Sequence, residues 1–202
     1  MTGSHTPPPW PGYQLFFQRF FRGMADPLRG EEQYDLILPI VVTAPDRIPQ
    51  PHLLAEPPLW PFDTCYSYFA ITSDEFLDEQ YNLTLAPEAD EIETVQDDFS
   101  LPHNRYIQLT TDGVGESGWL PNYQADLWLV GNQAGFRGVP IRLNSRTGGL
   151  LVQTGRVRTL LGRRAMIGTG LRMIIHLDGT PTVSIWASDE LLERNRKLLE
   201  NH

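Results

Sequence analysis

Residues 137–177 read RGVPIRLNSRTGGLLVQTGRVRTLLGRRAMIGTGLRMIIHL, and the fold class can be argued from this stretch. Short apolar runs alternate in it with turn residues such as Thr147-Gly148-Gly149 and Thr169-Gly170. This punctuation is typical of hairpins and meanders. It predicts strands at residues 139–144, 149–154, 156–161, 164–168 and 171–177.

Arginine is concentrated in the same stretch, with eight arginines and no acidic residue from residue 137 to residue 172. Successive side chains of a strand point to opposite faces, so the alternation predicts a sheet with one apolar face and one arginine-bearing face. The candidate binding residues of that face, for a protein interface or an anion, are Arg142, Arg156, Arg158, Arg164, Arg172 and His176.

The N-terminal region is rich in proline and aromatic residues. The run Pro7-Pro8-Pro9-Trp10-Pro11 predicts an extended arm. Aromatic residues at helical spacing in residues 13–24 predict an amphipathic helix with Phe16, Phe17, Phe20 and Phe21 as its docking side chains. Packing on the protein's own sheet is the favoured interpretation of this helix, and docking on a partner or a membrane surface is the alternative.

The remaining segments predict further strands at residues 34–43, 65–72, 81–86, 105–111, 125–130 and 182–187. Pro39 interrupts the first of them and predicts a sheet edge or a bulge. Residues 44–62 contain six prolines and predict an extended loop that docks on a partner. Ser73 and Ser188 predict caps for helices at residues 74–80 and 189–200.

These elements predict a mainly β fold: an antiparallel β-sandwich or barrel with an N-terminal aromatic helix and a C-terminal helix. Residues 1–33 form the predicted arm and helix, and residues 34–202 form a single β-rich domain that ends with the helical segment 188–200. A chain of 202 residues suffices for one sizeable core.

Net charge is −15 in residues 1–136 and +6 in residues 137–202. Six acids crowd one segment, the acidic partner loop: Glu88, Asp90, Glu91, Glu93, Asp97 and Asp98. Three partners suit the arginines: carboxylates of the same chain, carboxylates of a neighbouring copy, or phosphate of a ligand. We favour the neighbouring copy, because the acids exceed what one face needs. The acidic excess argues against nucleic acid as a partner.

Catalytic and metal-binding motifs are weak. Gly113-Val-Gly115-Glu-Ser-Gly118 matches a dinucleotide fingerprint, but Pro121 follows where a helix should begin, so a hairpin loop is favoured. The five histidines lack metal-ligand spacing, and Cys65 lacks an activating neighbour. We therefore expect no cofactor and no metal, and the sequence leans against an enzyme without deciding the question.

A single cysteine and the lack of any long apolar run favour a cytoplasmic protein without a transmembrane segment, or one in a particle assembled in the cytoplasm. The functional hypothesis is a structural or assembly subunit with protein partners, in a homo- or hetero-oligomer. Phage and phage-tail-like particles are built from such β subunits with extended arms. The main alternative is a β-barrel module that binds a small anionic or apolar ligand. An enzyme without a readable motif and a nucleic-acid contact protein are the weaker alternatives.

Overall fold

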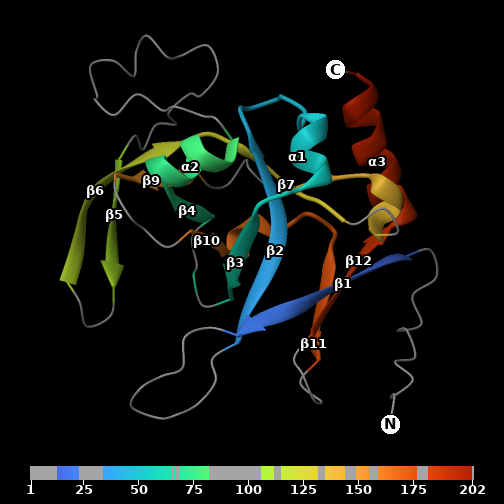
Figure 1. Ribbon diagram of the computed structural model, residues 1–202, viewed down its shortest axis with the longest axis horizontal. Helices are drawn as coiled ribbons and strands as arrows, with labels where there is room; N and C mark the ends of the chain where they lie inside the picture. The colour runs from blue at the N-terminus through green and yellow to red at the C-terminus, as the bar shows by residue number, and fades with distance from the viewer. Residues whose placement is uncertain are drawn as a thin grey trace.

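The apolar run of residues 34–43 forms β2 (Tyr34–Thr43), which passes through the middle of the computed structural model (Figure 1). The structure describes residues 13–22, 34–64, 66, 69–81, 106–111, 115–131, 135–143, 149–154, 159–176 and 182–201. Along its length β2 pairs antiparallel with β1 (Tyr13–Arg22), β3 (Leu59–Asp63) and β7 (Asp126–Leu129). Leu38, Ile40 and Val41 are fully buried, as a continuous apolar strand requires when both faces are covered.

The strands join into one mixed sheet of twelve within the described residues. Their order is β11-β12-β1-β2-β3-β10-β4-β9-β6-β5, and β7 pairs with β2 and β8. The remaining strands are β4 (Ala70–Ser73), β5 (Tyr106–Thr111), β6 (Gly115–Tyr123), β8 (Ile141–Arg142), β9 (Leu150–Gln153), β10 (Leu160–Gly162), β11 (Arg172–His176) and β12 (Thr182–Ser188). The pairs β3–β10 and β4–β9 are parallel, and the other pairs are antiparallel.

The mainly β fold and the C-terminal helix are therefore confirmed, while the wholly antiparallel sheet is corrected to a mixed one. Neither the sandwich nor the barrel is confirmed. The strand path is open, since its end strands β11 and β5 do not pair with each other in the part of the chain that the structure describes. The hairpin β5–β6 and the pair β11–β12 lie on different sides of the molecule (Figure 1).

The predicted N-terminal aromatic helix is wrong, because residues 13–22 form strand β1. Residues 13–19 pair with β12, and residues 20–22 pair with the start of β2. Phe16, Phe17, Phe20 and Phe21 stand in register with Ile185, Ser184, Leu36 and Asp35 respectively. Aromatic residues suit strands, and pairing with two distant strands overrides a helical spacing that a short isolated segment cannot enforce.

The proline-rich segment 44–62 is not the extended loop that its composition predicts. It contains a short helix, α1 (Pro51–Ala55), with proline in its first turn, and most of β3. Leu53, Trp60 and Phe62 are buried and anchor this segment on the core, while most of its other residues are exposed or half-buried. Pro39 lies inside the sheet, where its carbonyl oxygen accepts from Val130 N at 3.0 Å. On that side of β2 the pairing with β1 ends and the pairing with β7 begins, so the missing proline N–H interrupts no ladder.

Two further helices begin where their caps predict. The Ser73 hydroxyl accepts from Phe76 N at the start of α2 (Asp74–Tyr81), and the Ser188 hydroxyl accepts from Leu191 N at the start of α3 (Asp189–Glu200). Leu191 and Leu192 are the buried apolar residues of α3. The predicted strand 164–168 is instead a 3-10 turn, η2 (Arg163–Ala165), followed by a tight loop in which Gly168 has a φ of +77°. None of the described helices is long and apolar enough to cross a membrane.

Candidate functional site

The structure separates the predicted arginine face into different places. Arg142 lies in β8, which pairs with β7, whereas Arg172 and His176 lie in β11 at one end of the sheet order. Arg164 belongs to the turn η2. Arg156, Arg158 and the acidic partner loop, residues 88–98, lie outside the described residues. The single arginine-bearing sheet face is therefore not formed by the residues that can be placed.

Arg142 is engaged inside the molecule. Its Nη2 lies 2.7 Å from Asp126 Oδ2 and 3.1 Å from Asp46 Oδ1. The Asp126 side chain is only 2% exposed, and its Oδ2 also accepts from Asp46 N at 2.8 Å. We call Arg142, Asp46 and Asp126 the ion-pair cluster. It joins β7, β8 and the turn after β2.

The same arginine connects the cluster to the C-terminal helix. Arg142 N donates to Asn195 Oδ1 at 2.8 Å, and Asn195 Nδ2 donates to Leu191 O at 2.9 Å. Asn195 is buried on α3 and thus completes the hydrogen bonding at the short strand β8. A buried carboxylate and a buried amide that are both satisfied within the chain indicate an architectural role for Arg142.

The sequence prediction missed Asp46, Asp126 and Asn195. A signal for Asp126 was present, since it is the lone charge in the apolar strand Ala125–Val130. A carboxylate in such a strand costs free energy unless it is paired, so a buried ion pair was the expected consequence. The partner could not be read from the sequence, because Arg142 and Asp46 are distant along the chain.

A second group of arginines lies on the surface. We call residues 163–176, which comprise η2, the loop after it and β11, the cationic edge. Arg163, Arg164 and Arg172 are exposed, and no acidic residue occurs in this stretch. Two large apolar side chains are exposed beside them in sequence: Ile167 at 59% and Ile175 at 39%. Exposed cations and exposed apolar side chains that follow one another along the chain are candidates for contact with another molecule.

The loop that presents Ile167 is held in place by hydrogen bonds. The Thr169 hydroxyl donates to Met166 O at 2.7 Å and accepts from Leu171 N at 3.1 Å. Arg194 of α3 donates through Nη2 to Thr169 O at 3.2 Å. Ile167 is therefore exposed on an ordered turn.

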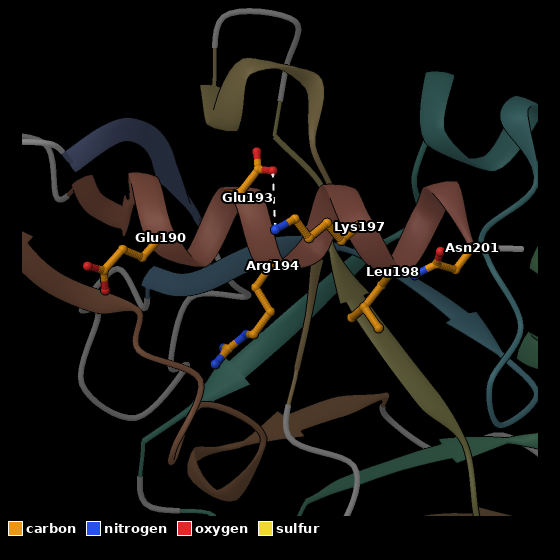
Figure 2. A pocket seen from close by; sticks show the side chains of 6 residues that line it. All are labelled: Glu190, Glu193, Arg194, Lys197, Leu198 and Asn201. Carbon is orange, nitrogen blue, oxygen red and sulfur yellow. Dashed lines mark ion pairs between the residues drawn. The ribbon is translucent and has the colours of Figure 1, made fainter.

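A groove of about 510 Å³ runs along the outer side of α3 (Figure 2). Among the described residues, its lining side chains come from α3 and the residue that follows it: Glu190, Glu193, Arg194, Lys197, Leu198 and Asn201. Glu193 pairs with Lys197 at 3.8 Å and also with Arg196. Ligand sites are enclosed and converge from several elements, so an open groove whose described lining lies on one helix and its C-cap does not favour a small-molecule site.

Tyr81 is the titratable group with the clearest perturbation. Its hydroxyl donates to Ile40 O at 3.0 Å and accepts from Trp60 Nε1 at 2.7 Å. Burial raises the pKa of the Tyr81 phenol well above its ordinary value, and the hydrogen bond from Trp60 opposes part of that shift. The neutral phenol joins α2 to β2 and β3, while Phe76 packs edge-on against both rings. This arrangement is a structural hydrogen-bond hub.

Strain occurs in the turn before β8. Phe136, Arg137 and Gly138 of η1 (Gly135–Gly138) have φ values of +52°, +53° and +72°. Two consecutive non-glycine residues in this region are uncommon. The Phe136 ring is fully buried, and Arg137 Nη2 lies 3.1 Å from Asp189 Oδ1 at the start of α3. Burial of the ring and the ion pair offset the backbone strain, which again indicates architecture.

The chemical motifs of the sequence do not develop into sites where the structure describes them. Residues 115–123 form strand β6, paired with β5 and β9, so the glycine-rich segment does not open a helix there. Among the described residues, His, Cys, Asp and Glu form no group of three that could hold a metal ion. Cys65 and residues 112–114 lie outside the described residues.

Comparison with known proteins identifies no relative. No family model, no curated protein and no solved structure matches this chain.

Proposed function

We propose that the protein is a non-enzymatic subunit of a larger assembly, such as a phage or phage-tail-like particle, and that its copies associate through acidic-to-arginine contacts. One observation supports this most directly: the cationic edge exposes three arginines and two isoleucines in a stretch without an acid. Guanidinium groups stay charged at every working pH, so a partner that brings carboxylates to this edge is favoured electrostatically. The same partner would remove Ile167 and Ile175 from water.

The location of the cationic edge also favours a protein partner over a small ligand. The interior of the described fold is filled by large side chains, among them Trp60, Phe69, Trp128 and Phe136, all of which are buried. The exposed arginines and isoleucines lie on the outside of the molecule. Exposed side chains of this kind suit contact with another macromolecule, whereas small ligands need concave sites. The carboxylates can come from residues 88–98 of a neighbouring copy, where six acids occur.

The test is a charge reversal on the cationic edge. We expect the wild-type chain to associate at micromolar concentration, as measured by size-exclusion chromatography with light scattering. Arg163→Glu with Arg164→Glu should weaken that association by more than about tenfold, because rim charges set encounter and affinity. The unfolding midpoint should change little, since surface substitutions away from buried features have small effects.

A matched control is available on α3, where Arg196→Glu with Lys197→Glu makes the same change in net charge at exposed positions. This control should leave association intact. If both double variants lose the same affinity of association, net charge alone explains the effect and the proposal is wrong. A wild-type chain that stays monomeric would also contradict it. A monomer that binds a small anion in a salt-dependent manner would favour the ligand-binding alternative instead.

A further inference from the structure

β11 is the terminal strand of the sheet in the described part of the chain, and one apolar side chain on it is unusually exposed. Met173 and Ile175 point to the same face of β11, because they are two residues apart. Met173 packs against the main hydrophobic core. Ile175 stands opposite Val183 of β12, which is fully buried, yet Ile175 itself is 39% exposed.

The difference in exposure between Val183 and Ile175 reflects the strands that flank them. Val183 has strands on both of its sides, β1 and β11, whereas β11 has a neighbour on the β12 side only, as far as the described strands show. Ile175 is therefore exposed on a strand that has no second lateral neighbour among the described strands. A strand added beside β11 would cover Ile175 and would pair with the backbone groups of the sheet edge.

The charge at the start of β11 indicates the chemistry of the added strand. Arg172 begins β11, and residues 163–176 contain no acidic residue. Opposite charges in directly facing cross-strand positions stabilise a sheet, and like charges destabilise it. An acidic extended segment with occasional apolar residues fits this edge, and a basic one does not.

We infer that β11 receives an acidic segment of a second copy by β-strand addition. This inference rests on the assembly role proposed above and names its mode of contact. Residues 88–98, EADEIETVQDD, are the segment of the chain with this composition. The contact joins two different surfaces, so it is heterologous and propagates from copy to copy.

Two variants, each defective in one of the two surfaces, test this arrangement. Ile175→Glu places a negative charge on the edge strand, which repels an acidic added strand. A second variant, with Glu91→Gln, Glu93→Gln, Asp97→Asn and Asp98→Asn, neutralises the acidic segment and keeps β11 intact. Each variant alone should be monomeric. Their equimolar mixture should form a one-to-one dimer that does not grow, because only one productive contact remains possible.

A peptide experiment separates strand addition from simple charge attraction. A synthetic peptide of residues 88–98 should bind the full-length chain, and proline at successive peptide positions should weaken binding in an alternating pattern. The alternation arises because every second amide of an added strand donates to the edge. Ile175→Glu should abolish peptide binding, while the control Ile167→Glu, which adds the same charge outside the strand, should reduce it less than about threefold.

The outcomes distinguish this inference from the proposed function. If the wild-type chain assembles but the mixture of variants stays monomeric, or if the proline series shows no alternation, strand addition at β11 is wrong and the assembly role stands. If the wild-type chain neither assembles nor binds the peptide, both are wrong. A one-to-one dimer with an alternating proline series supports both.

Discussion

Removing the guanidinium of Arg142 should destabilise the protein strongly without affecting association of the folded chain. The variant is Arg142→Met, which keeps an unbranched apolar stem and removes the charge. Asp126 would then retain its charge at 2% exposure with Asp46 N as its remaining described donor. Loss of one partner of a buried ion pair typically costs about 3–5 kcal/mol.

The geometry favours the lower end of that range. The Arg142 side chain is itself 25% exposed and Asp46 is 77% exposed, so their contact contributes about 0–1 kcal/mol. The contact with buried Asp126 accounts for most of the effect. We expect a loss of about 3 kcal/mol, which for a chain of this size lowers the melting temperature by about 6–12 °C.

A double-mutant cycle isolates the pair. Asp126→Asn removes the charge but keeps an oxygen that accepts from Asp46 N, so it should cost about 1–2 kcal/mol. On that background Arg142→Met should cost about 1 kcal/mol, which implies a coupling free energy of about 2 kcal/mol. Urea unfolding gives all four values. Equal costs of Arg142→Met on the two backgrounds would refute the buried pair, as would a cost below about 1 kcal/mol in the wild-type chain.

Two further predictions concern packing and pH. A Cβ at Gly149 would lie 1.7 Å from Asn122 Oδ1, so Gly149→Ala should cost about 2–3 kcal/mol in urea unfolding. The control Gly138→Ala has open space around it and should cost about 1 kcal/mol through its φ of +72° alone; the opposite ranking would contradict the packing. Because the pKa of Tyr81 is raised in the folded chain, the unfolded chain loses the phenol proton at a lower pH than the folded chain does. The stability that the protonated phenol contributes is complete below about pH 10 and falls as the pH rises further. Tyr81→Phe should cost about 1–3 kcal/mol at neutral pH, because the Trp60 N–H loses its acceptor. The variant should also lose less stability than the wild-type chain at alkaline pH. If both chains lose the same stability there, groups other than Tyr81 cause the loss.

The sequence was most informative where a structure depends on neighbouring residues. The caps Ser73 and Ser188 and the apolar stripe of α3 are local signals, and both helices begin at the predicted residues. Strands β5, β7, β9, β11 and β12 also lie within their predicted ranges or differ by one residue. Their alternation is a property of short segments, so no knowledge of the strand order was needed.

The errors occur where distant residues decide the structure. The aromatic segment 13–22 has spacings that suit a helix and residue types that suit a strand, and pairing with β12 and β2 resolves the choice. The prediction of one arginine-bearing face assumed that strands consecutive in sequence are adjacent in space. In the actual order, β9 and β10 are separated by β4, which comes from the first half of the chain. Sequence periodicity has no information on that order.

The ion pairs of the structure bear on the uneven charge of the chain. Arg142 reaches from the basic part to Asp46 and Asp126 of the acidic part, whereas the pairs Arg137–Asp189 and Arg196–Glu193 lie within residues 137–202. Pairing within the basic part leaves the charge difference between the two parts unchanged. Arg142 thus connects the two parts, and its contact with the buried Asp126 carboxylate contributes most of the stability assigned to it. Arginines of the cationic edge are exposed and, on the proposed function, determine association. The two groups therefore predict opposite phenotypes: Arg142→Met should unfold at lower temperature and still associate when folded, and Arg163→Glu with Arg164→Glu should fold normally and fail to associate.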